Sequence, residues 1–367
     1  MSALTALTEA MRVFTGFTAL NLMVLASAAV LIATNRSIGK RERRAFLRSV
    51  ISLMAIAAID WFTYVTSGSH PELRWVHTVL MALSFSIAPF IPVAIAHVIF
   101  PDPHDRLAMI VLGVHAVFQV ISIFGGFVFW VDEGNMYHRG PLYFVYMTVY
   151  TASSIYLVIA SVRAGRTYQS VSFAAVISIL LCLAGGVLIQ VVDPTVRTTW
   201  MAVSVAVILF FMFYADMILR SDALTKLLNR HSYDEFLAKP TLPCVFVMVD
   251  VDDFKHVNDT YGHAFGDECL AGIAVMLRRI FGNAGLCYRT GGDEFVVIMT
   301  DRHGEVDGYI EKVKAAVEEA RSSDERLPGV SVGYAFADKD CESVVSVLNE
   351  ADQAMYKSKR LGKRESR

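Results

Sequence analysis

Two acidic clusters are the residues of this sequence best suited to chemistry. Asp250, Asp252 and Asp253 follow one apolar run, and Asp293 and Glu294 follow a pair of glycines. Mg²⁺ prefers oxygen ligands and commonly takes one or two protein carboxylates together with the phosphates of a substrate. Because acidic turns are more often only solvated loops, the prediction of a magnesium site depends on whether the fold brings the two clusters together.

The elements around these clusters predict that they meet. Residues 244–249 form an unbroken apolar run, typical of a central buried strand, which ends at Asp250. Residues 286–289 and 295–299 are the arms of a hairpin joined through Gly291 and Gly292, a dipeptide suited to the positive φ angles of tight turns. Helices are expected at 224–239, 264–281, 304–322 and 342–361, and a further strand at 329–337. In this α+β pattern Asp250 and Asp293 end neighbouring strands.

Five ordered motifs resemble those of the GGDEF diguanylate cyclases. Residues 289–295 read RTGGDEF, residues 222–230 read DALTKLLNR, and residues 250–263 read DVDDFKHVNDTYGH, followed by Gly266 and Asp267. Residues 330–335 and 351–359 resemble the family's late strand and last helix. The resemblance spans roughly 221–364 and implies a nucleotidyl-cyclase-like α+β domain, a central antiparallel sheet with flanking helices. It also implies that the domain joins two GTP molecules into cyclic di-GMP.

The same resemblance assigns roles to the acidic clusters. Asp250, the carbonyl of Val251 and Asp293 would hold two Mg²⁺ ions per active site, with Mn²⁺ as an alternative metal. Metal ions in such sites lower the pKa of an attacking hydroxyl and neutralise developing charge. Glu294 matches the residue that activates the 3′-hydroxyl, and metal ligation is its alternative role. Lys255 would add positive charge near the transition state.

Guanine recognition is assigned to the stretch that follows. Guanine presents two adjacent donors, which a single carboxylate can accept. By resemblance Asp267 takes this part, Asn258 adds a contact, and His263 belongs to the same substrate-binding stretch. An acidic residue at position 267 favours selectivity for GTP.

Phosphate binding is assigned to two places in the chain. The backbone amides of Phe254 and Lys255 would cradle phosphates. Lys359 and Lys363 lie on one face of the expected last helix and would reach the terminal phosphates, although a basic helix end is by itself more often only solvated. The family usually has arginine at the second position. Lysine lacks the bidentate fork, so we expect weaker nucleotide affinity.

A second departure concerns feedback. Many members of the family carry an RxxD motif whose Arg and Asp precede the first glycine of the signature by nine and six residues. Gly282 and Gly285 stand at those positions here. We therefore expect no product inhibition through that site.

The composition of the chain before about residue 220 is typical of a membrane protein. Hydrophobic residues make up 54% and charged residues 19% of the sequence, and charge is sparse before about Arg220. Seven apolar runs are each near the roughly 20 residues that span a bilayer; they lie at 13–34, 49–67, 76–100, 107–130, 142–162, 170–191 and 200–219. The sequence thus predicts an all-α seven-helix bundle in 1–219 and a soluble domain in 220–367. Ala26-Ser27-Ala28 resembles a signal-peptidase site, but the length of its run favours an uncleaved helix.

Basic residues predict the orientation. The first loop holds the largest cluster, and cationic loops tend to stay cytoplasmic; the cluster comprises Arg36, Lys40, Arg41, Arg43, Arg44 and Arg48. The N-terminus is therefore expected outside a bacterial inner membrane and the soluble domain in the cytoplasm. The five cysteines include no CxxC pair and are expected to be reduced. A net charge of -2 points to no nucleic-acid partner.

Several polar residues fall within the expected spans. Ionisable groups at this depth are either paired between helices or functional; the residues are Asp60, Trp61, His97 and His115. A heme or metal site built from the two histidines is an alternative for which their spacing does not argue. A pocket for a small molecule of unknown identity is another. Pro89 and Pro92 should kink the third helix.

The expected partners follow from the chemistry. Because each site holds one GTP, the product requires two domains facing each other, and a homodimer is expected, regulated by an unknown small-molecule or membrane signal at the bundle. One alternative is a receptor whose soluble half only binds GTP or a partner. Another is a transporter with an appended cyclase, although no internal repeat is evident.

Overall fold

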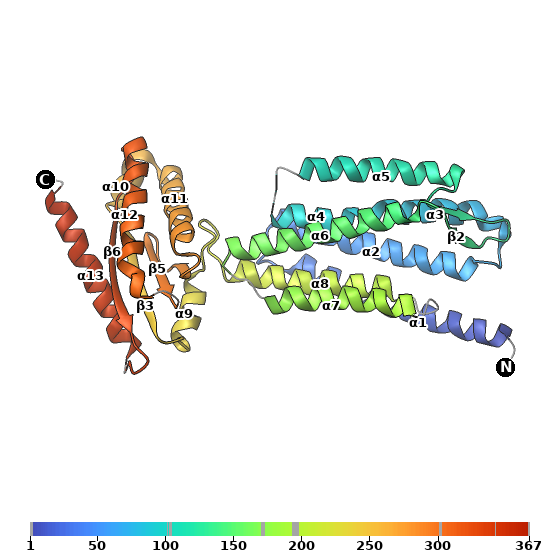
Figure 1. Cartoon of the computed structure of the whole chain (residues 1–367), viewed down its shortest axis with the longest axis horizontal. Coiled ribbons are helices and arrows are strands. Elements are labelled where there is room, and N and C mark those ends of the chain that lie inside the picture. The colour runs from blue at the N-terminus through green and yellow to red at the C-terminus, as the bar shows by residue number, and fades with distance from the viewer. Residues whose placement is uncertain are drawn as a thin grey trace. The chain divides into compact units, whose positions relative to one another are not determined.

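The computed structural model describes residues 3–100, 102, 105–169, 173–192, 198–300, 303–341 and 343–365. The chain divides into two compact units. Unit 1 comprises residues 1–164 and 172–216, and unit 2 comprises residues 165–171 and 217–367. Figure 1 shows long helices in unit 1 and a sheet flanked by helices in unit 2.

Unit 1 consists mainly of long apolar helices. They are α1 (Ala3–Thr34), α2 (Lys40–Thr66), α3 (Arg74–Ile87), α4 (Phe90–Ile99), α5 (Asp105–Gly125), α6 (Tyr143–Thr167), α7 (Phe173–Val192) and α8 (Thr199–Leu219). Within the described residues, six segments are long and apolar enough to cross a membrane, one of them joining the short helix η1 (Pro71–Leu73) to α3 and α4. In α7 only the shorter apolar helix Ile177–Gly186 is found. The seven-span count therefore stays a prediction.

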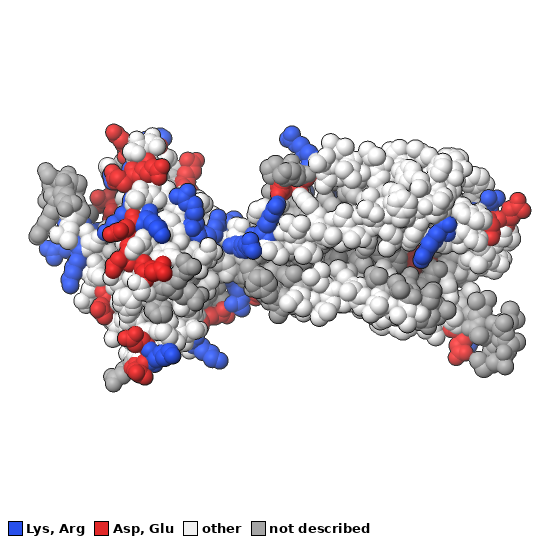
Figure 2. All heavy atoms as spheres, in the orientation of Figure 1, with Lys and Arg blue, Asp and Glu red and all other residues white. Residues whose placement is uncertain are grey.

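The surface of unit 1 is apolar. Phe124 is 81% exposed and Val114 is 66% exposed, and Figure 2 shows few charged residues over the middle of these helices. So much apolar surface is rarely exposed to water, because its hydration is unfavourable. Together with the lengths of the helices, this surface indicates a membrane-anchored protein.

Two local breaks in unit 1 bear on the predictions. The third span is interrupted between Ile87 and Phe90, at Pro89, as predicted. The expected fourth span, 107–130, is wrong at its end. Helix α5 stops at Gly125 because Gly126 takes a positive φ of 63°, and the chain then enters the hairpin of β1 (Phe129–Val131) and β2 (Tyr137–Arg139).

Unit 2 contains a four-stranded antiparallel sheet in the order β4-β5-β3-β6. Its strands are β3 (Cys244–Val251), β4 (Gly285–Arg289), β5 (Glu294–Met299) and β6 (Val330–Ala337). Strand β3 pairs on both sides and is buried over nearly its whole length, which confirms the predicted central strand.

Helices cover both faces of this sheet. Alternate residues of β3 point to opposite faces. Val245 and Val247 pack with α11 (His263–Phe281) and α12 (Val306–Ser323), whereas Phe246 packs with α9 (Arg230–Ala238) and α13 (Val344–Glu365). Burying a side chain the size of Phe246 contributes about 1.5–3 kcal/mol. Helix α10 (Phe254–Tyr261) and the short helix η2 (His303–Glu305) complete the unit.

The expected helix at 224–239 begins later than predicted, at Arg230. Asp222 accepts hydrogen bonds from the amide and hydroxyl of Thr225, and Lys226 takes a positive φ of 61°. The amide of Leu228 then donates to the carbonyl of Cys287 in β4 (3.1 Å). This turn places residues 222–229 beside the outer strand β4. Asn229 then caps α9 by accepting a hydrogen bond from the amide of Ser232 (3.0 Å).

Candidate active site

The two acidic clusters lie side by side, as the sequence predicts. In the register of β3 with β5, Asp250 is opposite Glu294. The amide of Val251 donates to the carbonyl of Asp293 (3.2 Å), which ties the end of β3 to the hairpin turn. The carboxylates of Asp250 and Asp293 therefore share one edge of the sheet.

A lysine from the last helix occupies this edge. The ammonium of Lys359 donates to Oδ1 of Asp250, whose side chain is only 12% exposed. Burial raises the pKa of Asp250, Lys359 opposes this, and the carboxylates of Asp293 and Asp252 raise it further. Burial would favour neutral Lys359, but Asp250 outweighs it, and the pKa of the lysine is raised. The edge therefore binds positive charge.

This donor set suits a divalent cation. Asp250 and Asp293 offer carboxylates and Val251 a carbonyl, and the oxygens of a substrate phosphate would add to them. Among the described residues no three His, Cys, Asp or Glu side chains gather in a metal-binding arrangement. The carboxylate of Asp252 accepts a hydrogen bond from the hydroxyl of Ser331 (2.6 Å).

Arg289 holds the turn that carries Asp293 and Glu294. Its guanidinium donates to the carbonyl of Gly292 through Nη2 (2.7 Å) and Nε (3.3 Å), and through Nη1 to Asp222 (3.1 Å). Burial would raise the pKa of Asp222, but hydrogen bonds from Thr225 and Arg289 outweigh it and lower that pKa. An ionised Asp222 thus orients Arg289, and Arg289 fixes the turn.

The turn itself corrects one expectation. Four residues, Thr290–Asp293, connect β4 and β5, and neither Gly291 nor Gly292 has the positive φ predicted for a tight turn. A Cβ at Gly291 would lie 2.7 Å from Oε2 of the exposed Glu294 side chain and 3.3 Å from its Cβ, so a larger residue there would displace the Glu294 carboxylate. Glu294 is exposed beside this turn.

A second group of residues lies where α10 meets α11. Gly262 joins the two helices with a positive φ of 86°. A Cβ on Gly266 would lie only 2.0 Å from Oδ1 of Asn258, so this glycine lets the Asn258 amide approach α11. Asp267 follows directly in the chain and is exposed, as is His263 at the start of α11.

The first turn of α10 presents backbone amides. The first amides of any helix lack intrahelical acceptors and favour anions. Phe254 and Lys255 open α10; Phe254 packs against the core, and Lys255 is exposed. This geometry suits the predicted phosphate cradle.

Residues 219–365 match the family model described as "Diguanylate cyclase, GGDEF domain". These residues are a GGDEF domain.

Known relatives agree in this part of the chain. The probable diguanylate cyclase DgcI of Escherichia coli is 36% identical over 144 residues, which is 39% of this chain and 31% of DgcI. Diguanylate cyclase VdcA of Vibrio cholerae is 32% identical over 152 residues, or 39% of this chain and 44% of VdcA. The chain thus spans less than half the length of these relatives. A crystal structure of the GGDEF domain of DgcB from Caulobacter crescentus in complex with c-di-GMP has 33% identity and a TM-score of 0.35, and covers 39% of this chain and 91% of that one.

Two residues that position the site were not singled out from the sequence. Arg289 and Gly266 both lie within the quoted motifs of the GGDEF domain, but their roles depend on contacts with Asp222 and Asn258. Asp222 and Arg289 lie 67 positions apart, and each motif holds other charged residues, so the sequence alone does not pair them.

The structure places only part of the two lysines predicted to bind phosphates, Lys359 and Lys363. Lys359 pairs with Asp250 and remains 26% exposed. Lys363 belongs to α13, but its side chain lies outside the described residues. Their predicted contacts with terminal phosphates remain predictions.

The two glycines of the missing inhibitory motif sit in tight surroundings. A Cβ on Gly282 would lie 2.4 Å from the carbonyl oxygen of Arg278, and a Cβ on Gly285 would lie 2.3 Å from that of Ile298. Because both neighbours are backbone atoms, larger side chains would require the backbone of the GGDEF domain to move.

The two histidines expected within the spans each contact polar groups of the protein, although among the described residues Nδ1 of His115 and Oε1 of Gln119 are buried without a hydrogen-bond partner. His97 pairs through Nδ1 with Asp105 (2.6 Å) and lies 2.9 Å through Nε2 from Arg41. The ring of His115 is buried beside Gln119 (3.2 Å) and the carbonyl of Phe85 (3.3 Å). The two histidines thus have separate surroundings, and within the described residues neither belongs to a metal cluster.

Proposed function

We propose that the chain is a membrane-bound diguanylate cyclase, which condenses two GTP molecules into cyclic di-GMP and two pyrophosphates. Residues 1–219 would form the membrane sensor region and residues 220–367 the catalytic domain. The observation that carries the proposal is the shared sheet edge, where Asp250, Asp293 and Glu294 meet.

Metal binding is proposed at that edge. Asp250, the Val251 carbonyl and Asp293 would hold two Mg²⁺ ions, and Mn²⁺ would suit the same oxygens. When bound, such ions acidify the attacking hydroxyl and neutralise charge on the phosphates. The ion pair of Lys359 with Asp250 supports this, because a largely buried carboxylate is stabilised by a positive charge beside it.

Side chains and backbone amides at this end of the sheet would act on the reacting groups. Glu294 would accept the proton of the 3′-hydroxyl, which then attacks the α-phosphate of the second GTP as pyrophosphate leaves. The amides of Phe254 and Lys255, and the charge of Lys255, would stabilise the phosphates in the transition state. Lys359 and Lys363 would bind the terminal phosphates.

Guanine would be read between α10 and α11. Asp267 would accept both donors of the Watson-Crick edge, and Asn258 would add a further hydrogen bond. His263, one turn before Asp267, would line the same substrate site. The close approach of Asn258 to Gly266 supports this assignment, since it sets the amide beside Asp267.

Two active sites must face each other to form the cyclic product, so the working unit would be a homodimer. The chain would lie in a bacterial inner membrane, with its N-terminus outside and the GGDEF domain in the cytoplasm. A small-molecule or membrane signal at the helices would change the output only through unequal affinity for productive and unproductive dimers.

Glu294→Gln provides the sharpest test of this mechanism. The amide keeps the shape of the side chain but cannot take a proton, so product formation should fall by about 10²–10⁴-fold. GTP binding should change little. Full-length protein in nanodiscs would be assayed for GTP binding and for cyclic di-GMP by chromatography, with Glu318→Gln on α12 as the matched control. Equal turnover by Glu294→Gln and wild type would refute the assigned role.

A further inference from the structure

The start of helix α2 carries a row of exposed cations. Lys40, Arg44 and Arg48 recur every four residues and therefore lie along one face of the helix, where all three are exposed. We call these three residues the cationic stripe. The same face continues with three exposed apolar residues, Ile51, Ala55 and Ala58. It therefore changes from cationic to apolar between Arg48 and Ile51.

The opposite face of α2 packs inside unit 1. Phe46, Val50 and Leu53 are at most 1% exposed. On a helix with 3.6 residues per turn they lie on the far side from the cationic stripe. The ring of Phe46 meets the ring of Phe211 in α8 edge to face, with 5.2 Å between the ring centroids. This packing fixes the rotation of α2, so the cationic stripe points away from the other helices of unit 1.

The length of α2 sets the cationic stripe at the level of lipid headgroups. Its 27 residues are apolar enough to cross a membrane and correspond to about 40 Å of helix. The hydrocarbon core of a bilayer is about 30 Å thick, so about seven residues of the helix extend beyond it. Because the exposed face is apolar from Ile51 onwards, this excess falls at the end that begins with Lys40. Arg48, nearer the hydrocarbon, can extend its guanidinium towards the same level.

No carboxylate neutralises the cationic stripe. Glu42 is the only acidic residue between positions 36 and 48. A Cβ on Gly39 would clash with Oε2 of Glu42, so this carboxylate lies over the start of the helix. Among the described residues the three cations form no ion pair, and Arg44 donates only to the carbonyl of Lys40 in its own helix (3.2 Å). Their charges are therefore available to a ligand outside unit 1.

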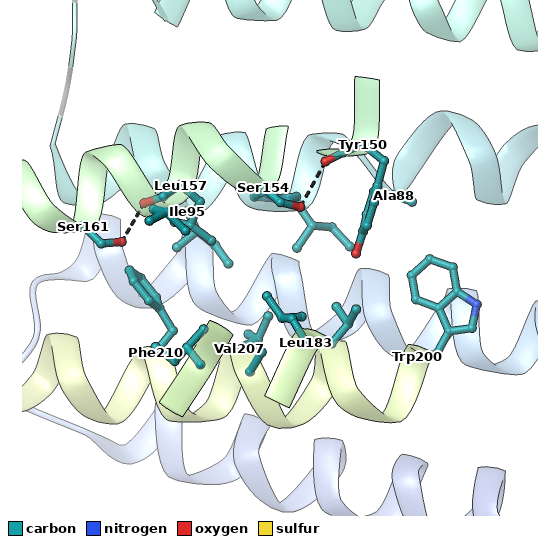
Figure 3. A pocket seen from close by; sticks show the side chains of 16 residues that line it. Ala88, Ile95, Tyr150, Ser154, Leu157, Ser161, Leu183, Trp200, Val207 and Phe210 are labelled. Carbon is teal, nitrogen blue, oxygen red and sulfur yellow. Dashed lines mark hydrogen bonds between the residues drawn. The ribbon is translucent and has the colours of Figure 1, made fainter. Parts of the chain in front are cut away.

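The interior of unit 1 offers an anion no comparable partner in its pocket. Figure 3 shows this pocket, which lies between α4, α6, α7 and α8. Among the described residues that line it there is no Lys, Arg or His. An anion there would be buried without a partner, at a large energetic cost. The surface of α2 therefore suits an anionic ligand better than this pocket does.

From these observations we infer that the cationic stripe binds the headgroup phosphate of an acidic phospholipid, whose acyl chains lie along the apolar face that begins at Ile51. Three cations attract a lipid of net negative charge more strongly than a zwitterionic one. A second copy of the chain fits this face less well, because two symmetric stripes would oppose cations with cations. The lipid site is separate from the proposed catalytic residues, so its failure would leave the proposed function intact.

Lipid binding by the wild-type protein tests the inference directly. Full-length protein in a neutral detergent would be titrated with dioctanoyl phosphatidylglycerol or dioctanoyl phosphatidylcholine, and bound lipid would be counted by native mass spectrometry. Each cation beside an anionic lipid contributes about fivefold in affinity, so we expect phosphatidylglycerol to bind more tightly by about tenfold or more. The preference should shrink in about 0.5 M ammonium acetate, because salt screens exposed charges. Equal affinity for the two lipids would overturn the inference.

Substitutions locate the lipid site. Removal of the three charges together should abolish most of the preference, in the variant Lys40→Gln, Arg44→Gln, Arg48→Gln. A matched control on α12 loses the same charge from exposed side chains and should keep the preference, in the variant Lys312→Gln, Lys314→Gln, Arg321→Gln. An unchanged preference in the first variant would refute this location.

Other occupants of the face give different results. If ammonium phosphate displaces phosphatidylglycerol, the cationic stripe takes soluble anions and the inference is wrong. If the stripe variant changes the oligomeric mass of the protein and keeps the lipid preference, a second copy of the chain covers this face, and the inference is again wrong.

Discussion

Arg289 should couple the opening motif of the GGDEF domain to the turn that carries Asp293 and Glu294. Arg289→Ala removes an ion pair with Asp222 and both hydrogen bonds to Gly292. The side chains of Arg289 and Asp222 are 15% and 24% exposed, so solvent screens their interaction only in part. Hydrogen bonds to charged groups contribute about 1.5–3 kcal/mol each, and because these contacts overlap we expect a loss of about 2–4 kcal/mol in local stability.

The effect on turnover should be larger than the effect on GTP binding. A displacement of about 1 Å at a reacting group can cost about 10²-fold in rate. We therefore expect kcat for cyclic di-GMP formation to fall about 100-fold in Arg289→Ala, with a smaller change in KM. Hydrogen exchange of the β5 amides would report the loosened turn.

A double-mutant cycle separates this coupling from general damage. Asp222→Ala, Arg289→Ala and the double variant should show a coupling energy of about 1–3 kcal/mol in local stability. Arg321→Ala, which removes an exposed ion pair with Glu318 on α12, serves as the control and should leave kcat unchanged. Wild-type kcat in Arg289→Ala, or strictly additive effects of the two substitutions, would refute the positioning role.

Further predictions concern the guanine site, feedback and pH. Gly266→Ala should raise KM for GTP by about tenfold, because the new Cβ would lie 2.0 Å from Oδ1 of Asn258 and push that amide away. An unchanged KM in steady-state kinetics would count against this site. Asp267→Asn should reduce the preference for GTP over ITP, which lacks the exocyclic amine, by about tenfold; an undiminished ratio of kcat/KM values would be inconsistent with a carboxylate reading both donors. Cyclic di-GMP should not inhibit the enzyme through positions 282 and 285. Tight binding of cyclic di-GMP that is lost in Gly285→Ala would contradict this prediction, because that substitution forces the backbone at position 285 to move. The lowered pKa of Asp222 means that its contribution to stability is complete above its unfolded pKa of about 3.9 and is lost as the pH falls through the lower folded value. The gap in unfolding temperature between wild type and Asp222→Asn should therefore close below about pH 4, and a gap that widens on acidification would reverse the assigned sign.

The sheet was predictable because its strands are encoded locally. The apolar run before Asp250 predicts a central strand, which the structure confirms, and the hairpin arms around the glycines follow from their β-branched and aromatic residues. The start of α9 was missed because residues 224–228 have helical propensity, whereas their structure is set by Asp222, the positive φ of Lys226 and pairing with β4. Tertiary contacts overrode propensity there.

The site was predictable at the level of clusters but not of contacts. Pairing of β3 with β5 follows from the pattern and brings Asp250 beside Glu294. The ion pair of Asp250 with Lys359 joins positions 109 residues apart, and no local periodicity specifies it. The positive φ expected in the turn was wrong, because the four-residue connection between β4 and β5 does not need the left-handed backbone of a two-residue turn.

The stoichiometry of the reaction tests the central claim most directly. Purified full-length protein in nanodiscs would be incubated with GTP and Mg²⁺, and cyclic di-GMP, pyrophosphate, GDP and phosphate would be quantified together, with an Asp293→Ala, Glu294→Ala variant as the control. The account predicts one cyclic di-GMP and two pyrophosphates for every two GTP consumed, and no product from the variant. Bound but unconverted GTP, or conversion to GDP and phosphate instead, would contradict it.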